Sequence, residues 1–475
     1  MTRSLLVAGV SSGCGKTSVT LGLLAALTRR GVAVAPFKTG PDFIDPGLHR
    51  LACGRTSHNL DSWMLPDAAN RALLARHARG SGLALIEGAM GLFDGTGPPG
   101  GPGSAAHMAR LLGAPVALVA DARGMAQSVA ALATGYARFD PRLRVAGLIL
   151  NRVGGPGHRE VLAEALEATG VPLLGMLARD ESLALPSRHL GLVTAEDLEH
   201  RPGWLERLAD WVEAGIDLDR LLALLPEHAQ EAHAPTTLAA RVPAPDAPVP
   251  DMPEPDPAAA SGAERVRLGL ARDRAFCFVY EENLRLLEAA GAEIVPFSPL
   301  ADARLPESLH GLYLPGGYPE LHARTLSENR TMLEALRAFC ASGRPVLAEC
   351  GGFMALMDSL VDAAGRRWPM AGAFPCAARM GPRFAALGYR EARFVRDTPL
   401  GPAGTTARGH EFHYSSLESA PNLPGAYDIS GRKGPLPGPG GFLAGNALGS
   451  YVHLHFASNP GLAPAFADAM RRAGG

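Results

Sequence analysis

The sequence predicts an α/β protein built from two doubly wound domains, and three observations lead to this fold class. Short apolar runs alternate with amphipathic stretches in both halves of the chain, which is the pattern of parallel strands connected by helices. A Pro/Ala-rich segment that lacks this alternation separates the two halves. The length of 475 residues suits two or three domains, each large enough to bury its own core.

Five apolar runs predict the strands of the first domain. They span residues 4–10, 32–37, 83–87, 115–120 and 145–151. Ligands of such parallel sheets bind outside the carboxyl ends of the strands. The residues that follow each run are therefore the candidates for a functional site.

The segment 226–264 predicts a linker, because it is rich in Ala and Pro and has no apolar periodicity. Such a composition buries too little side chain to fold, and its prolines favour extended, solvated conformations. We therefore expect one domain over 1–225 and a second over 265–475. Four further runs predict a second sheet, and they span residues 266–271, 293–297, 311–315 and 345–348.

The composition favours a soluble protein whose partners are small molecules. Hydrophobic residues make up 47% of the chain and charged residues 19%, and the net charge of -2 gives no reason to expect nucleic acid or an anionic membrane as a partner. The six cysteines form no CxxC pair, so neither a zinc site nor a disulfide framework is indicated. The longest apolar stretch, 111–120, is too short to span a bilayer, and we expect a cytoplasmic location.

The segment after the first predicted strand has the residues of a phosphate-binding loop. It runs GVSSGCGKTS, and a helix is expected from about Lys16. Peptide N–H groups around Gly13 and Gly15 would face phosphate, Lys16 would reach the terminal phosphates, and the Thr17 hydroxyl can bind Mg²⁺. Its outer glycines are separated by five residues instead of four, so this is a variant loop. A plain glycine turn, the alternative, would not need the Lys and Thr at its exit.

Acidic residues follow the second and third predicted strands. Asp42 and Asp45 lie in KTGPDFIDP, and Glu87 and Asp94 lie in EGAMGLFDG. Mg²⁺ takes oxygen ligands and shares them with nucleotide phosphates, so one or two of these acids should bind the metal. The alternative is turn chemistry beside Pro or Gly, which weighs most for Asp45 and Asp94.

Asn151 ends the fifth predicted strand, where its amide is suitably placed to read the base of a nucleotide. An Asn after a strand is also an ordinary turn residue, and both interpretations stay open. The sequence indicates no partner for His49, His58 or His107.

Cys350 of the second domain has the setting of a nucleophile. In GRPVLAECGGFMAL a buried strand turns at this cysteine into a helix, and Gly351 and Gly352 permit the tight bend. The N-terminus of a helix lowers the pKa of a thiol, which would activate Cys350. The alternative is a buried structural cysteine, which is what we expect of the other three cysteines of this domain.

Two further segments supply partners for this thiol. The glycine turn in LYLPGGYPE presents N–H groups, chiefly that of Gly317, which could join that of Gly351 in an oxyanion hole. The segment GSYVHLHF places His453 and His455 on one face of a strand. Either histidine could take the thiol proton and return it to the leaving ammonia.

The segment GHEFHY has the spacing HExH instead of HExxH, which disfavours a zinc site. His410 and His413 within it could line the substrate pocket or close a turn, and the sequence does not separate these alternatives.

Seven motifs together resemble the cobyrinic acid or hydrogenobyrinic acid a,c-diamide synthase family of corrinoid biosynthesis. They are GVSSGCGKTS, KTGPDFIDP, EGAMGLFDG, LPGGYPE, AECGGFMAL, GHEFHYS and GSYVHLHF, and they cover nearly the whole chain except the linker. The first half also resembles dethiobiotin synthetase, with a P-loop NTPase-like sheet, and the second half resembles class I glutamine amidotransferases.

The resemblance implies an ATP-dependent carbon–nitrogen ligase with ATP, L-glutamine and a corrinoid as partners and Mg²⁺ as cofactor. ATP would convert the a- and c-acetate carboxylates into acyl phosphates, which ammonia from glutamine then attacks. Cys350 would be the nucleophile and His453 its base. The residues that would bind ATP are Gly13, Gly15, Lys16, Thr17, Ser18 and Asn151. Those that would bind the metal are Thr17, Asp42 and Glu87. Asp45 and Asp94 would face the substrate or its acyl phosphate. A homodimer is the candidate assembly.

One departure from the wider glutaminase pattern concerns His455. Many class I glutaminases complete a triad with His-x-Glu, but here a histidine follows Leu454. A Cys–His dyad without an acid should hydrolyse glutamine slowly unless the other domain aligns it. We therefore predict weak glutamine hydrolysis in the absence of ATP and corrinoid.

Two alternative functions stay open. Cobyric acid synthase shares both halves, although KTGPDFIDP fits the diamide synthases better. A partitioning-type nucleotide switch with a non-catalytic second half would carry an additional lysine early in the phosphate loop, where this chain has serine and glycine.

Overall fold

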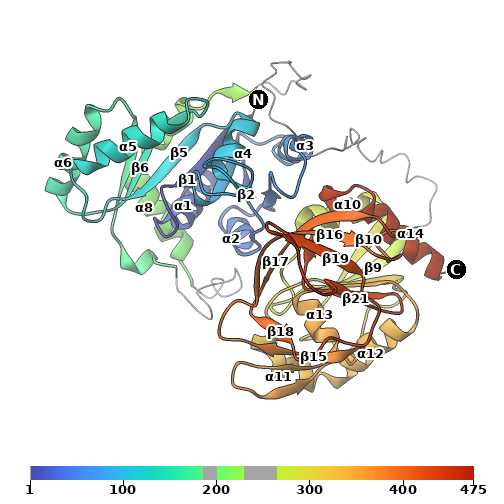
Figure 1. Cartoon of the computed structure of the whole chain (residues 1–475). Coiled ribbons are helices and arrows are strands. Elements are labelled where there is room, and N and C mark those ends of the chain that lie inside the picture. Colours follow the sequence, from blue (N-terminus) through green and yellow to red (C-terminus); the bar gives the residue numbers. More distant parts are fainter. Residues whose placement is uncertain (1, 186–200, 229–264, 475) are drawn as a thin grey trace. The chain divides into compact units, whose positions relative to one another are not determined.

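The computed structural model describes residues 2–185, 201–228 and 265–474 (Figure 1). The chain divides into two compact units, Met1–Pro253 and Glu254–Gly475. Within the described part, every helix is too short or too polar to cross a lipid bilayer.

The described residues of unit 1 form one sheet in the strand order β3-β2-β4-β1-β5-β6-β7, parallel throughout, with the short antiparallel β8 beside β1. The strands are β1 (Thr2–Gly9), β2 (Val34–Thr39), β3 (His58–Leu60), β4 (Leu83–Gly91), β5 (Val116–Asp121), β6 (Val145–Val153), β7 (Leu173–Ala178) and β8 (Glu227–His228). The helices are α1 (Lys16–Arg29), α2 (Ile44–Cys53), α3 (Asp67–His77), α4 (Ala105–Leu112), α5 (Ser128–Phe139), α6 (Pro156–Glu167), α8 (Trp204–Gly215) and α9 (Leu218–Ala223). All five strands predicted for this half are present, and β3, β7 and β8 were not predicted.

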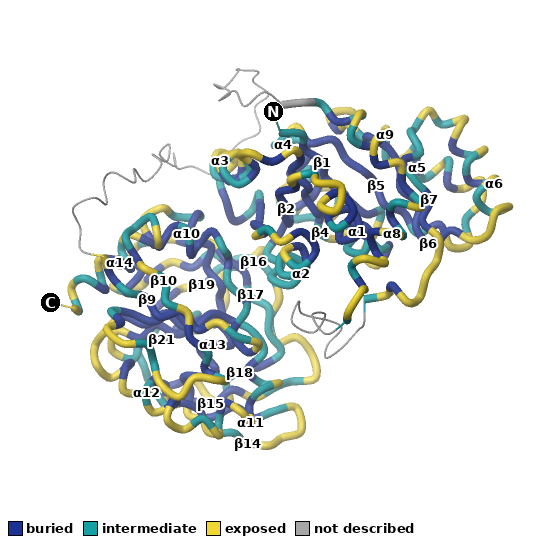
Figure 2. Tube along the Cα trace, turned by 180° about the vertical axis from the view of Figure 1, so that it is seen from behind, coloured by how far each residue is buried: buried dark blue, intermediate teal, exposed yellow. Residues whose placement is uncertain are grey.

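The core of unit 1 lies between the sheet and the helices α1, α8 and α9. The central strands β1, β4 and β5 are buried over most of their length (Figure 2). Helix α1 approaches α8 closely, because a methyl group on Gly22 would lie 2.4 Å from Cγ2 of Val212. This packing fixes the helix that follows the phosphate loop.

The expected linker lies outside the described residues from 229 onward. Its first residues differ from the prediction, because Glu227–His228 pair with Thr2 and Arg3 as β8. Main-chain hydrogen bonds to β1 hold these residues in the sheet, so a linker can begin only after His228.

The described residues of unit 2 form three sheets. The main one has the order β10-β9-β11-β12-β22-β21 and is parallel except for β21. It consists of β9 (Val266–Ala271), β10 (Ala292–Phe297), β11 (Gly311–Leu314), β12 (Val346–Glu349), β21 (Gly441–Ala444) and β22 (Ala447–Ser450). The four strands predicted for this half are β9 to β12. The helices are α10 (Glu281–Ala289), α11 (Ala323–Glu328), α12 (Arg330–Ala341), α13 (Gly351–Leu356) and α14 (Leu462–Gly474).

Two smaller sheets of unit 2 were not predicted. One has the order β14-β13-β15-β18 and the other β20-β19-β16-β17-β23. Their strands are β13 (Met357–Val361), β14 (Arg367–Pro369), β15 (Phe374–Met380), β16 (Ala386–Phe394), β17 (Thr406–His413), β18 (Ser415–Leu417), β19 (Tyr427–Gly431), β20 (Gly434–Pro435) and β23 (His453–Leu454). The second sheet holds His453, a candidate site residue, because β23 pairs with β17.

Candidate active sites

The phosphate loop of unit 1 joins β1 to α1 and is held by hydrogen bonds to its carbonyl groups. Asn151 Nδ2 donates to the carbonyl of Cys14 (3.0 Å), and Arg152 donates to that of Gly13 (3.0 Å). Gly15 has φ 97°, and a methyl group there would lie 2.0 Å from Asn151 Nδ2. Only glycine combines this backbone conformation with so close an approach.

Helix α1 begins at Lys16, as predicted, and its N-terminal N–H groups have neither a side-chain cap nor an acidic residue in the first turn. They remain available to an anion. Beside them, Gly13, Gly15, Ser18 and Asn151 help to line a cavity of about 380 Å³. A cavity of this volume is in the range of small-molecule sites.

The structure assigns Asn151 a structural contact that the sequence left open. Its Nδ2 holds the phosphate loop, and its Oδ1 accepts from the N–H of Arg152 (2.8 Å). Asn151 lies at the cavity, but both polar atoms of its amide already bind the main chain. The side chain therefore shapes the loop, and a base contact would have to compete with these bonds.

Glu87, fully buried in β4, is the centre of a polar cluster beside the loop. Its Oε1 accepts from Thr17 Oγ1 (2.8 Å) and lies 3.1 Å from Lys38 Nζ. Its Oε2 lies 2.7 Å from Nε2 of His49, whose Nδ1 is 3.0 Å from Ser57 Oγ. The cluster thus joins the first turn of α1 to the ends of β2 and β4.

The charges of this cluster stabilise one another. Burial alone would raise the pKa of Glu87, but Lys38 and His49 outweigh it and hold that pKa well below its usual range. Burial alone would lower the pKa of Lys38, but Asp45 and Glu87 hold it above its usual value. Lys38 and Glu87 are therefore both charged at neutral pH.

The other predicted acids lie in two settings. Asp45 forms an ion pair with Lys38. Asp42 Oδ1 accepts from the N–H groups of Ile44 (2.7 Å) and Asp45 (3.1 Å), which is turn chemistry at the start of α2.

Asp94 belongs to a turn as well. Its Oδ2 accepts from the N–H of Gly91 (2.9 Å), the last residue of β4, whose register partner is Gly9 at the start of the phosphate loop. Glu87 thus contacts Thr17 directly and is linked to Asp45 through Lys38. Asp94 lies in the turn that follows β4.

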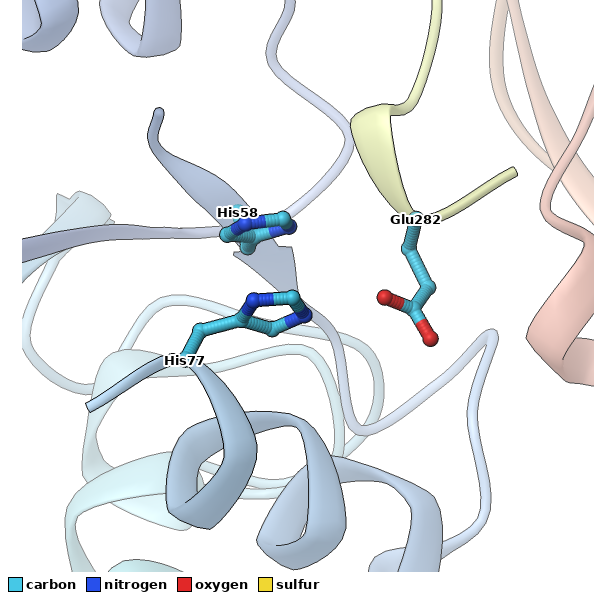
Figure 3. Close-up of side chains that lie close together, drawn as sticks. All are labelled: His58, His77 and Glu282. Carbon is cyan, nitrogen blue, oxygen red and sulfur yellow. The ribbon is translucent and has the colours of Figure 1, made fainter. Parts of the chain in front are cut away.

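Lys38 and His49 belong to this cluster but were not among the site residues predicted from the sequence. Lys38 had a usable signal, because it ends a predicted strand in the same motif as Asp42. His49 had none, since its partner Glu87 is 38 residues away. His58, for which no partner was indicated, stacks on His77 of α3 with ring centroids 3.5 Å apart (Figure 3).

Cys350 of unit 2 lies in a sharp turn between β12 and α13. Its φ is 47°, a conformation that non-glycine residues rarely adopt, and its N–H donates to the carbonyl of Ser450 (2.7 Å). Such strain persists where the surroundings enforce it, often at a nucleophile. The predicted strand–turn–helix geometry is present.

The prediction that this position lowers the pKa of the Cys350 thiol is wrong for the structure described. Burial raises that pKa well above its usual value, and the negative charge of Glu320 adds to the effect. The peptide N–H of Gly351, at the start of α13, lowers the pKa but does not outweigh burial. The thiol is therefore neutral in this state.

The glycine turn after β11 lies against both predicted partners of the thiol. A methyl group on Gly351 would lie 3.0 Å from the peptide nitrogen of Gly317, so the two N–H groups of the expected oxyanion hole are neighbours. A methyl group on Gly316 would lie 2.2 Å from Cε1 of His453. This turn thus lies against both the start of α13, beside Cys350, and the imidazole.

His453 and His455 do not share one strand face, as the sequence had suggested, because β23 ends at Leu454. His453 is the register partner of His410. His455 instead accepts from the N–H of Ala457 through Nδ1 (3.3 Å), and its ring lies 4.6 Å from that of Tyr280. Only the ring of His453 is placed against the Gly316–Gly317 turn by these contacts.

Burial also governs the imidazole of His453. Burial, with His410 and His413 adding to it, lowers the pKa of His453 to about 3. His413 itself bonds Glu411 Oε1 (2.9 Å) and the carbonyl of Ser415 (2.6 Å), so it closes the corner between β17 and β18. The expected thiol–imidazole pair is neutral in both members.

Two family models match the chain. The CobQ/CobB/MinD/ParA nucleotide binding domain matches residues 5–193, and the CobB/CobQ-like glutamine amidotransferase domain matches residues 267–461. These matches coincide with the two sites described above.

Curated relatives match the chain over nearly its whole length. A cobyrinate a,c-diamide synthase of Syntrophotalea carbinolica is 47% identical over 98% of this chain and 98% of its own. A hydrogenobyrinate a,c-diamide synthase of Mesorhizobium japonicum is 42% identical over 95% and 98%, and a cobyrinate a,c-diamide synthase of Salmonella typhimurium is 41% identical over 99% and 98%. The chain therefore belongs to the family of cobyrinate and hydrogenobyrinate a,c-diamide synthases.

Proposed function

We propose that this chain is an ATP-dependent ligase that hydrolyses glutamine and uses the ammonia to amidate the a- and c-acetate carboxylates of cobyrinate or hydrogenobyrinate. The observation that carries the proposal is the presence, in one chain, of a phosphate loop with buried acids at its exit and a cysteine in a strained strand–helix turn. Neither site alone can form an amide from glutamine. Because the reaction consumes ATP and needs a free thiol, a reducing cytoplasm suits it.

In unit 1 the peptide N–H groups at Gly13 and Gly15, with Lys16 and Ser18, bind the phosphates of ATP. Thr17, Asp42 and Glu87 would hold Mg²⁺. This donor set fits a hard cation, because all its ligand atoms are oxygens and Thr17 Oγ1 gives its proton to Glu87, which leaves its lone pairs available. When bound, Mg²⁺ neutralises phosphate charge.

Asp45 and Asp94 face the corrinoid side of this site. A substrate carboxylate oxygen attacks the terminal phosphorus of ATP, ADP leaves, and an acyl phosphate forms. Ammonia then attacks the acyl carbon, the C–O bond to phosphate breaks, and inorganic phosphate leaves. The protein's part is to position these groups and to compensate their charge, and Lys38 fixes Asp45 for that purpose.

In unit 2 the thiol proton of Cys350 passes to His453, and the thiolate attacks the amide carbon of glutamine. The N–H groups of Gly317 and Gly351 stabilise the oxyanion. His453 returns the proton to the leaving ammonia, and water hydrolyses the thioester to glutamate. Because thiol and imidazole are both neutral in the state described, the free enzyme should hydrolyse glutamine slowly.

The test is nitrogen transfer to the corrinoid, counted by mass spectrometry. The enzyme is incubated with ATP, Mg²⁺ and glutamine whose amide nitrogen carries ¹⁵N, and with either cobyrinate or hydrogenobyrinate. We expect two labelled nitrogen atoms in the preferred corrinoid and none without ATP. Absence of label from both corrinoids would refute the proposed substrate.

A further inference from the structure

Glu320 lies beside the nucleophile but was assigned no role by the sequence. It belongs to the 3₁₀ turn η2 (Pro319–His322), which follows directly on the Gly316–Gly317 turn. This segment touches the start of α13, since a methyl group on Gly351 would lie 2.9 Å from Cδ of Pro319. The side chain is half-buried, and its charge acts on Cys350.

Two other carboxyl groups act on this thiol, and both are bonded within the protein. Glu349, at the end of β12, accepts from Tyr313 Oη through Oε2 (2.7 Å) and from the N–H of Leu454 through Oε1 (2.9 Å). Glu411, on β17, pairs with Arg390 Nε (2.6 Å) and His413 Nε2 (2.9 Å). The carboxylates of Glu349 and Glu411 therefore already have hydrogen-bond partners within the protein.

Glu320 differs from these two acids. Among the residues that the structure describes, no cation binds its carboxylate. Burial raises the pKa of Glu320 to about 7, and its own peptide N–H is the hydrogen-bond donor that opposes this shift. An unpaired carboxylate at this place is unfavourable for a thiol enzyme, because a negative charge opposes formation of the thiolate that performs the reaction. Such a charge is tolerable in an active site when a bound substrate supplies the missing cation.

Glutamine carries one cation, its α-ammonium group, at the opposite end from the amide that Cys350 attacks. We propose that the Glu320 carboxylate binds this ammonium group, so that glutamine itself neutralises the charge that opposes ionisation of the thiol. The inference rests on the proposed glutaminase role of Cys350 and extends it. Glu320 then selects substrates that carry an α-ammonium group. Its negative charge also keeps the Cys350 thiol unreactive while glutamine is absent.

The test compares wild type with Glu320→Gln and with the matched control Glu328→Gln, an exposed acid at the end of α11. In Glu320→Gln we expect the KM for glutamine to rise about tenfold or more, as for the loss of a charge-assisted bond. Amidation with ammonium should stay at the wild-type rate. Glutaramate, which is glutamine without its α-amino group, should be a poor substrate of wild type, and the variant should discriminate less between it and glutamine.

A second readout follows the thiol directly. Alkylation of Cys350 by iodoacetamide, measured on its peptide by mass spectrometry, should be faster in Glu320→Gln than in wild type when glutamine is absent. A merely structural role would not make the thiol more reactive while glutamine binding weakens. Glu320→Asp, which keeps the charge, should return alkylation toward the wild-type rate.

Unchanged KM in Glu320→Gln, or equal use of glutamine and glutaramate by wild type, would overturn the inference. So would unchanged or slower alkylation of Cys350 in that variant. Alkylation needs no corrinoid, so it still tests the inference if the corrinoid proves not to be the substrate. Failure of wild type to use even ammonium would instead count against the proposed synthetase function.

Discussion

Lys38 Nζ lies 3.1 Å from Oε1 of Glu87, and the two residues are register partners on β2 and β4. Glu87 is inaccessible to solvent and Lys38 nearly so, and Asp45 completes the pair from α2. A buried charge is tolerated only when opposite charges and hydrogen bonds surround it. This ion pair therefore holds Glu87 in position, and Glu87 in turn binds the Thr17 hydroxyl at the end of the phosphate loop.

Replacing Lys38 by Met should destabilise unit 1 by about 3–5 kcal/mol, because two acids would lose their buried cation. Scanning calorimetry should show an earlier transition. The double variant Lys38→Met/Glu87→Gln should recover part of the loss, since it leaves one uncompensated charge fewer. A single variant as stable as wild type would show that the ion pair does not carry the energy assigned to it.

His49 should act on the synthetase reaction through Glu87. His49→Phe removes the contacts to Glu87 Oε2 and Ser57 Oγ in a fully buried place, and we expect a loss of about 1–3 kcal/mol in stability. Amidation should fall with glutamine and with ammonium alike, whereas alkylation of Cys350 should not change. A defect confined to glutamine-dependent turnover would contradict this role.

Asn151→Ala should weaken ATP binding without touching the glutaminase site. It removes the bond that holds the carbonyl of Cys14, and the loop would lose its fixed peptide orientation. We expect the dissociation constant of the nucleotide to rise about tenfold, equivalent to roughly 1.4 kcal/mol. Calorimetric titration with a non-hydrolysable ATP analogue provides the measurement, and unchanged affinity would exclude the role.

Glu349 should make the stability of unit 2 depend on pH. Burial raises its pKa to about 7, against about 4.3 in an unfolded chain. The folded state thus binds the proton of Glu349 more tightly than the unfolded chain does. The resulting contribution of Glu349 to the free energy of unfolding is fully present below about pH 4.3 and is lost as the pH rises to about 7.

Glu349→Gln imitates the protonated acid and can keep both hydrogen bonds, to Tyr313 and to the N–H of Leu454. Relative to wild type, the variant should gain on the order of 1–3 kcal/mol in unfolding free energy between pH 5 and pH 8. Thermal unfolding at the two pH values measures this. A variant with the wild-type pH dependence would show that Glu349 does not change its protonation state between pH 5 and pH 8.

Much of the fold could be predicted from apolar runs, because buried parallel strands leave a continuous signal in the sequence. The rule that ligands bind at strand ends also selected Thr17, Asp45 and Glu87, which the structure brings together. The small sheets of unit 2 escaped prediction because strands such as β16 mix exposed and buried residues without a long apolar run.

The chemistry of single groups was harder to predict. The pKa of the Cys350 thiol depends on its burial and on Glu320, which is 30 positions away in the sequence. The separation of His453 from His455 depends on where β23 ends. Both are consequences of tertiary packing, which local sequence patterns do not report.

In the proposed reaction one chain makes ammonia at Cys350 and consumes it at the phosphate loop. The most direct test is the nitrogen source used by Cys350→Ala, with Cys340→Ala, a buried cysteine of α12, as control. We predict that Cys350→Ala amidates the corrinoid with ammonium but not with glutamine, and that the control uses both. Glutamine-dependent amidation by Cys350→Ala at the wild-type rate would show that Cys350 does not release the ammonia from glutamine.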